Sequence, residues 1–187
     1  MRAFVGIALS GDFAPWFQEL TGALGPVARR VRLVPPASCH MTLRFLGEIP
    51  EDQTGEVASR LRGSVASLQV GSVSLERLGI FHRNGAASVL WAGPRLVSAT
   101  LKELAGRVTT ALAGLGSNAQ EEQFEPHVTL GRFLSGTRYE DVVSLESVAL
   151  RPFSSPIRRI VLYESLLGQG HPVYVVRATV SLAEFAE

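Results

Sequence analysis

The chain has 187 residues, of which 46% are hydrophobic and 19% are charged, and this composition excludes a disordered chain or a coiled coil. Eighteen basic residues against 17 acidic ones leave a net charge of +1, so a nucleic acid partner should be short or be held locally at its phosphates. The single cysteine, Cys39, excludes an internal disulfide framework and a multi-cysteine metal site.

The first part of the chain predicts a strand, a helix and a second strand. Residues 2–9, which are apolar after Arg2, fit a buried strand. Asp12 can cap a helix over about 13–30, although glycines and a proline weaken its second half. After a pair of prolines, the alternation of polar and apolar residues from His40 to Phe45 predicts a half-buried strand.

The later elements alternate between helices and strands. The first are a helix through Val57, Leu61, Val65 and Leu68, strands at about 69–80 and 87–92, and an amphipathic helix over 97–115. They are followed by a strand at about 125–133, a weaker helix over 139–147, and two strands at about 156–166 and 172–182, which Gly168-Gln169-Gly170 separates. The last strand carries an apolar face from Tyr174 to Leu182.

This order of elements favours an α+β fold. Short turns such as Asn84-Gly85 are typical of hairpins, so we expect antiparallel pairing instead of a doubly wound parallel sheet. No linker-like stretch interrupts the chain, and we expect residues 1–187 to form a single domain. The apolar N-terminal stretch is too short for a signal peptide and no run approaches a membrane span, so we expect a cytoplasmic protein with no membrane partner.

A short sequence element occurs twice. His40-Met41-Thr42-Leu43 lies on one predicted strand, and His127-Val128-Thr129-Leu130 lies on another, nearly half a chain length later. Two such copies indicate an ancient duplication, with two lobes that face each other across a cleft.

Strand geometry explains why this pattern suits catalysis. Side chains two residues apart share a face, so His40 accompanies Thr42 and His127 accompanies Thr129. Met41, Leu43 and Phe45 should then fill the core behind the first motif. Two imidazoles can act as general acid and general base near neutral pH, and two hydroxyls can hold phosphate oxygens. The motifs therefore predict phosphodiester chemistry without a metal.

Other polar residues give weaker signals. Cys39 should point away from the histidines, and Arg44 should lie on a solvated rim. His82 and His171 have no acidic or cysteine companions at ligand spacing, so we expect no metal site. Lys102 is the only lysine and no phosphate-binding loop occurs, so we expect no nucleotide cofactor. Phe124 is a core residue or a base-stacking one.

The flanking residues extend both motifs. The first spans Val34-Pro35-Pro36-x-x-x-His40-Met41-Thr42-Leu43-Arg44-Phe45-Leu46-Gly47, and the second spans Phe124-x-Pro126-His127-Val128-Thr129-Leu130-Gly131-Arg132. With these residues the chain resembles the RNA 2′,3′-cyclic phosphodiesterase family (2′-5′ RNA ligase, LigT/ThpR-like) of the 2H phosphoesterase superfamily. The resemblance spans essentially the whole chain. Leu33 departs from a common tryptophan, and residues 81–86 lack the proline and arginine often found there.

The resemblance implies a bilobal fold of two mainly antiparallel sheets with flanking helices and a V-shaped groove. It also implies a hydrolase that converts a terminal ribose 2′,3′-cyclic phosphate to a 2′-phosphate in RNA processing, without metal or cofactor, and reversible 2′-5′ ligation. His40 and His127 correspond to the acid–base pair, and Thr42, Thr129 and Arg132 to phosphate ligands. We expect His127 to activate the water and His40 to protonate the departing ribose 3′-oxygen.

The position of Arg132 conflicts with simple strand geometry. It lies five residues after His127, so strict alternation would point it to the opposite face. A bulge or turn at Gly131 would bring its side chain back to the face of the histidine.

Two alternative functions remain open at this point. The chain could hydrolyse a small cyclic nucleotide metabolite, or it could bind a nucleotide without catalysis. For the leading hypothesis the expected partners are RNA ends or short oligonucleotides with a 2′,3′-cyclic phosphate, and we expect a monomer with no protein partner.

Overall fold

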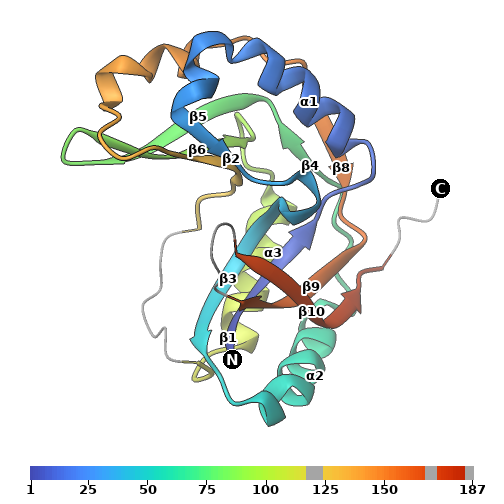
Figure 1. Ribbon diagram of the computed structural model, residues 1–187. Coiled ribbons are helices and arrows are strands. Elements are labelled where there is room, and N and C mark those ends of the chain that lie inside the picture. Colours follow the sequence, from blue (N-terminus) through green and yellow to red (C-terminus); the bar gives the residue numbers. More distant parts are fainter. Residues whose placement is uncertain (117–123, 167–171, 184–187) are drawn as a thin grey trace.

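The computed structural model describes residues 1–116, 124–166 and 172–183 (Figure 1). Its main sheet consists of β1 (Arg2–Ala8), β2 (Val31–Leu33), β3 (His40–Glu48), β5 (Arg77–Arg83), β6 (Ala86–Gly93), β7 (Val128–Phe133), β9 (Arg159–Leu166) and β10 (Val173–Ser181). The strands lie in the order β10-β9-β1-β3-β7-β6-β5, with β2 also paired to β7, and every pairing is antiparallel. Two further strands, β4 (Ser72–Leu75) and β8 (Phe153–Pro156), form a separate small sheet.

The helices are α1 (Phe13–Ala23), α2 (Thr54–Val65) and α3 (Ala99–Ala111), with 3₁₀ turns at Gly25–Arg30, Pro36–Ser38, Glu51–Gln53, Tyr139–Asp141 and Val143–Ser147. Each α-helix buries one apolar face, as Leu101, Leu104 and Val108 do on α3. The Ser98 hydroxyl caps α3 by accepting a hydrogen bond from the Leu101 amide. None of the described helices is long and apolar enough to span a membrane.

The main sheet divides into two halves at the β3–β7 contact. These strands share a single register pair, Met41 opposite Val128, and β2 then takes over the same edge of β7 through Leu33 opposite Gly131. Figure 1 shows β1, β3, β9 and β10 with α2 and α3 in the lower part of the molecule, and β2, β5 and β6 with α1 in the upper part. The predicted α+β class with antiparallel pairing is confirmed, and each half carries one of the two motifs.

Several predicted boundaries were wrong because strands change sheets. The stretch 69–80 is not one strand: it divides into β4 and β5, which lie in different sheets. The strand expected at about 156–166 is confirmed as β9, and Pro156 is the last residue of β8. The helix expected over 13–30 ends at Ala23, just before Gly25, whose φ of 55° is outside the helical region, and the Asp12 side chain makes no capping bond. Residues 139–147 form 3₁₀ turns, and the turn expected at 168–170 lies outside the described residues.

The predicted hairpin turn is confirmed. Asn84 and Gly85 have φ angles of 51° and 75°, as a two-residue turn between β5 and β6 requires.

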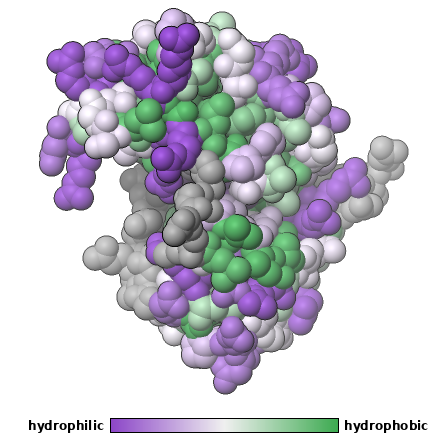
Figure 2. All heavy atoms as spheres, viewed as in Figure 1, coloured by the Kyte–Doolittle hydropathy of each residue, from purple (hydrophilic) through white to green (hydrophobic). Residues whose placement is uncertain are grey.

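Irregular pairing changes which side chains are buried. Met41 and Leu43 lie in the core as expected, but register shifts between β1 and β3 leave Phe45 47% exposed. A shift between β9 and β10 at Arg177 likewise leaves Val176 57% exposed, so the expected apolar face of the last strand is broken. Figure 2 shows hydrophobic side chains gathered on the surface over β10.

Arg44 does not lie on a solvated rim. Its guanidinium donates a hydrogen bond to the backbone carbonyl of Thr109 on α3, and it therefore ties β3 to the helix layer.

We predict that Gly131→Ala destabilises the fold by about 1–3 kcal/mol, because a Cβ there would collide with the Val31 side chain and come within 3.0 Å of the Arg32 carbonyl. The matched control is Gly106→Ala on α3, where nothing lies within 4 Å and the higher helix propensity should stabilise by about 0.5–1 kcal/mol. Urea denaturation of the two variants measures both effects. Equal stabilities would contradict the close approach of β2 to β7.

Candidate active site

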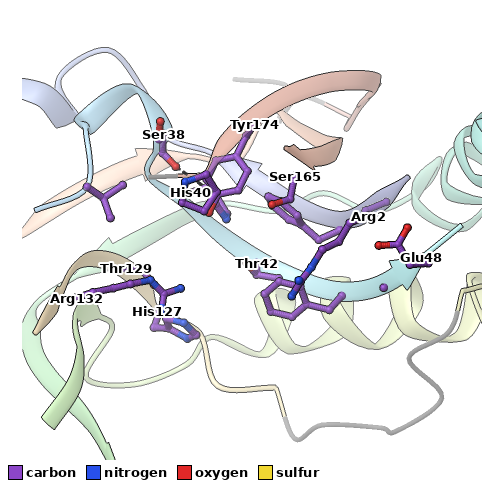
Figure 3. Close-up of a pocket in the computed structure, with 16 residues that line it drawn as sticks. Arg2, Ser38, His40, Thr42, Glu48, His127, Thr129, Arg132, Ser165 and Tyr174 are labelled. Atoms are coloured by element: carbon purple, nitrogen blue, oxygen red, sulfur yellow. Dashed lines mark hydrogen bonds between the residues drawn. The ribbon is translucent and has the colours of Figure 1, made fainter. Parts of the chain in front are cut away.

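A cavity of about 640 Å³ lies where the two halves of the sheet meet. All five residues predicted for the site line it: His40 and Thr42 from β3, and His127, Thr129 and Arg132 from β7 and the residue before it. Figure 3 shows His127, Thr129 and Arg132 grouped on one side of this space and His40 on the other. The tertiary structure therefore brings together the two motifs that lie far apart in sequence.

Both histidines are oriented by the same local hydrogen bond. The Nδ1 atom of His40 lies 2.8 Å from the carbonyl oxygen of Ser38, and Nδ1 of His127 lies 2.8 Å from that of Glu125. A carbonyl oxygen only accepts, so Nδ1 is the protonated nitrogen in each ring and Nε2 is left to exchange a proton. No sequence pattern pointed to these partners, because they are backbone atoms.

Aromatic rings surround His40. Phe4 stacks on its imidazole with centroids 4.6 Å apart, and Tyr174 approaches edge-on at 4.8 Å. Tyr163 lies 5.6 Å away. These residues belong to β1, β9 and β10, and sequence reasoning had assigned none of them to the site.

The second histidine has its own aromatic contacts. Phe81 meets the His127 ring edge-on at 4.8 Å, and the Trp91 ring lies 6.1 Å away. The Trp91 indole packs flat against Gly79, where any side chain would collide with it. Both imidazoles are thus held by packing as well as by hydrogen bonds.

Burial changes the protonation of His40. Loss of solvent lowers its pKa from 6.5 to about 4; the hydrogen bond to Ser38 opposes this shift, and the nearby His127 adds to it. His40 is therefore neutral at pH 7 in the free protein, which is the state that a general base requires. The sequence-based assignment instead makes His40 the acid, which requires its protonated form in the complex with substrate.

The conflict over Arg132 is resolved by a bulge. Leu90 of β6 pairs with Gly131, whereas Trp91 pairs with Thr129, so Leu130 is an extra residue on β7. The extra residue returns the Arg132 side chain to the face of Thr129. A bulge was expected at Gly131, and the structure has it one residue earlier, at Leu130.

Cys39 lies outside the cavity lining, as expected. Its thiol is buried and lies 3.5 Å from the carbonyl oxygen of Thr129 and 3.7 Å from that of Pro35. Desolvation raises the pKa of Cys39 to about 12, so the thiol stays protonated and is a poor nucleophile. Its contacts link the start of β3 to β7.

His82 and Phe124 are not among the residues that line the cavity. His82 stacks on Tyr139 with ring centroids 4.1 Å apart, and Phe124 packs against the core. His171 lies outside the described residues. Within residues 1–116, 124–166 and 172–183, no group of three or more potential ligands could hold a metal ion.

Comparisons with known proteins agree with this geometry. A family model described as the 2′-5′ RNA ligase superfamily matches residues 10–169. An RNA 2′,3′-cyclic phosphodiesterase of Archaeoglobus fulgidus is 30% identical over 93% of this chain and 96% of its own. The structure of TT0787 of Thermus thermophilus superposes over the full length of both chains with a TM-score of 0.78 at 24% identity. Escherichia coli LigT complexed with 3′-AMP matches over 97% of both chains, with a TM-score of 0.72 and 25% identity.

We predict that the His40 imidazole titrates well below pH 6, and that inorganic phosphate raises its pKa because an anion stabilises the imidazolium. The unfolded chain, with a histidine pKa near 6.5, then takes up a proton before the folded chain does. Stability should therefore fall as the pH falls from about 6.5 to 4. Proton NMR titration, with assignment by His40→Gln, measures the pKa directly. A pKa of 6.5 with or without phosphate would contradict the burial argument.

Proposed function

This chain belongs to the 2′-5′ RNA ligase superfamily, and we propose that it is an RNA 2′,3′-cyclic phosphodiesterase that converts a terminal ribose 2′,3′-cyclic phosphate to a 2′-phosphate. One observation carries this proposal. Two histidines, each with Nδ1 held by the carbonyl two residues before it, line one cavity together with two threonines and an arginine. This set matches an in-line displacement at phosphorus, which needs a base, an acid and ligands for the phosphate oxygens.

The chemistry follows from these groups. One imidazole takes a proton from water as the water oxygen attacks phosphorus. The bond from phosphorus to the ribose 3′-oxygen breaks, and the second imidazole gives that oxygen a proton, leaving the phosphate on the 2′-oxygen. A 5′-hydroxyl of another RNA end in place of water would form a 2′-5′ bond by the same two transfers, which is the ligase activity in the family name.

The other site residues act on the phosphate in this proposal. The Thr42 and Thr129 hydroxyls donate hydrogen bonds to its non-bridging oxygens, and the Arg132 guanidinium balances its negative charge. These contacts strengthen as charge builds on the oxygens in the transition state.

The identity of acid and base depends on the complex. Burial makes His40 neutral in the free protein, whereas a bound phosphate favours its protonated form. A bell-shaped pH profile arises from either assignment, since its limbs belong to the coupled pair. The sequence-based assignment of His127 as base and His40 as acid therefore stays a prediction that needs a different test.

The wider expectations stay predictions. Strands from both ends of the chain form one sheet and all five site residues come from one chain, which supports a single domain, 1–187, acting as a monomer. RNA ends as substrate and a cytoplasmic location belong to the same proposal.

We predict hydrolysis of an oligonucleotide that ends in a 2′,3′-cyclic phosphate, with no loss of rate in excess EDTA and no need for ATP. The product should be the 2′-phosphate isomer, because the 3′-oxygen is the one that leaves. Phosphorus NMR or chromatography against both isomers identifies the product. Loss of activity in EDTA that a divalent ion restores would overturn the metal-free mechanism.

We predict that His40→Ala and His127→Ala each lower kcat by roughly 10²–10⁴-fold on this substrate, the usual contribution of a positioned acid or base. His82→Ala, outside the cavity, is the matched control and should retain full activity.

A phosphodiester with a 4-nitrophenolate leaving group separates the two roles, because such a group departs without a proton. The variant that lacks the acid should recover much of its rate on this substrate, and the variant that lacks the base should not. The sequence-based assignment expects recovery by His40→Ala; recovery by His127→Ala instead would reverse the two roles.

A further inference from the structure

The pairing of β2 with β7 places two arginines side by side. Arg32 lies directly opposite Arg132 in this antiparallel register. Residues directly opposite each other point to the same face of a sheet, with Cα atoms about 4.5–5.5 Å apart. Arg132 lines the active-site cavity, so Arg32 lies on the cavity face as well.

The course of β2 leads to the same placement independently. Val34 follows Arg32 by two residues, and its amide continues the pairing with a 2.9 Å hydrogen bond to the Leu130 carbonyl. Side chains two residues apart share a face, and Val34 lines the cavity. Arg32 is exposed and is not part of the cavity lining itself. It therefore lies just outside the cavity, beside Arg132.

No acidic side chain of residues 1–116, 124–166 or 172–183 forms an ion pair with either arginine of this pair. Like charges directly opposite each other destabilise a sheet. Among the residues that the structure describes, neither guanidinium has a hydrogen bond or ion pair, whereas the neighbouring Arg30 is paired with Asp141 at 3.2 Å. The row of opposite residues continues across β6 and β5 with Val89 and Phe81, so it contributes no carboxylate. An anion from outside would balance this pair.

We propose that the two arginines hold consecutive phosphates of one RNA strand. On the basis of the proposed function, Arg132 contacts the terminal cyclic phosphate and Arg32 contacts the phosphate on the 5′ side of the terminal nucleoside. A planar guanidinium can donate two parallel hydrogen bonds to the oxygens of one phosphate. Because the net charge of the chain is only +1, RNA must be held by such local contacts. The substrate class is therefore an oligonucleotide end, in preference to a cyclic mononucleotide or a small metabolite that lacks the second phosphate.

The test compares two substrates in two variants. Cytidine 2′,3′-cyclic phosphate has only the terminal phosphate, and a trinucleotide with the same end also has the next one. Arg32→Gln should lower kcat/KM on the trinucleotide roughly tenfold, leave the mononucleotide within about twofold, and make the salt dependence less steep by about one phosphate contact. Arg62→Gln, an exposed arginine on α2, is the charge-matched control and should change neither substrate.

Equal losses on both substrates, or no loss on the trinucleotide, would overturn the proposal. Failure of the wild-type protein to hydrolyse either substrate would instead refute the proposed function. In that case fluorescence anisotropy with the trinucleotide 2′-phosphate decides the role of Arg32. Binding about tenfold weaker in Arg32→Gln but not in Arg62→Gln supports it, and equal binding overturns it. Thermal melting checks the fold, and Arg32→Gln should melt no lower than wild type because it removes a like-charge pair.

Discussion

The whole site depends on how one edge of β7 is shared by two strands. β3 pairs with this edge only at Met41 opposite Val128, and β2 pairs with it from Gly131 onward. A strand edge that passes from one partner to another cannot remain a continuous sheet, so β3 diverges there and the cavity opens beside the contact. Each motif lies next to this point, which is why one cavity receives both histidines.

The imidazoles of His40 and His127 are fixed in orientation by hydrogen bonds and by packing. Each imidazole has one nitrogen fixed by a backbone carbonyl and its ring packed against aromatic side chains, so little motion is needed to keep Nε2 available. The buried thiol of Cys39 contacts the Thr129 carbonyl from the β3 side and so helps to hold the two halves together. Aromatic burial also lowers the pKa of His40, so the packing that orients the ring adjusts its proton affinity as well.

Stability and function oppose each other at the edge of the cavity. The Arg32–Arg132 pair places two positive charges opposite each other, and the close approach of β2 requires a glycine at position 131. Both features are unfavourable or restrictive for folding alone. Under the proposal, both features serve phosphate binding, because the close approach of β2 to β7 places two arginines side by side. A chain with a net charge of +1 attracts a phosphate only through such local positive charge.

Local sequence patterns determined most of the elements, the α+β class, and four of the residues that meet at the cavity, His40, Thr42, His127 and Thr129, because strand alternation and paired motifs act over a few residues. Arg132 was expected there only from the family resemblance. Local patterns did not determine that the chain changes sheets within 69–80, since that change depends on β4 pairing with β8. Irregular strand pairing turns the Phe45 side chain toward the cavity and brings the Arg132 side chain to the same face as Thr129. Three features arise from contacts between strands that are distant in sequence: the aromatic rings around His40, its lowered pKa, and the position of Arg32 opposite Arg132. Only the tertiary structure could supply these contacts, because no local pattern records which strand will lie opposite another.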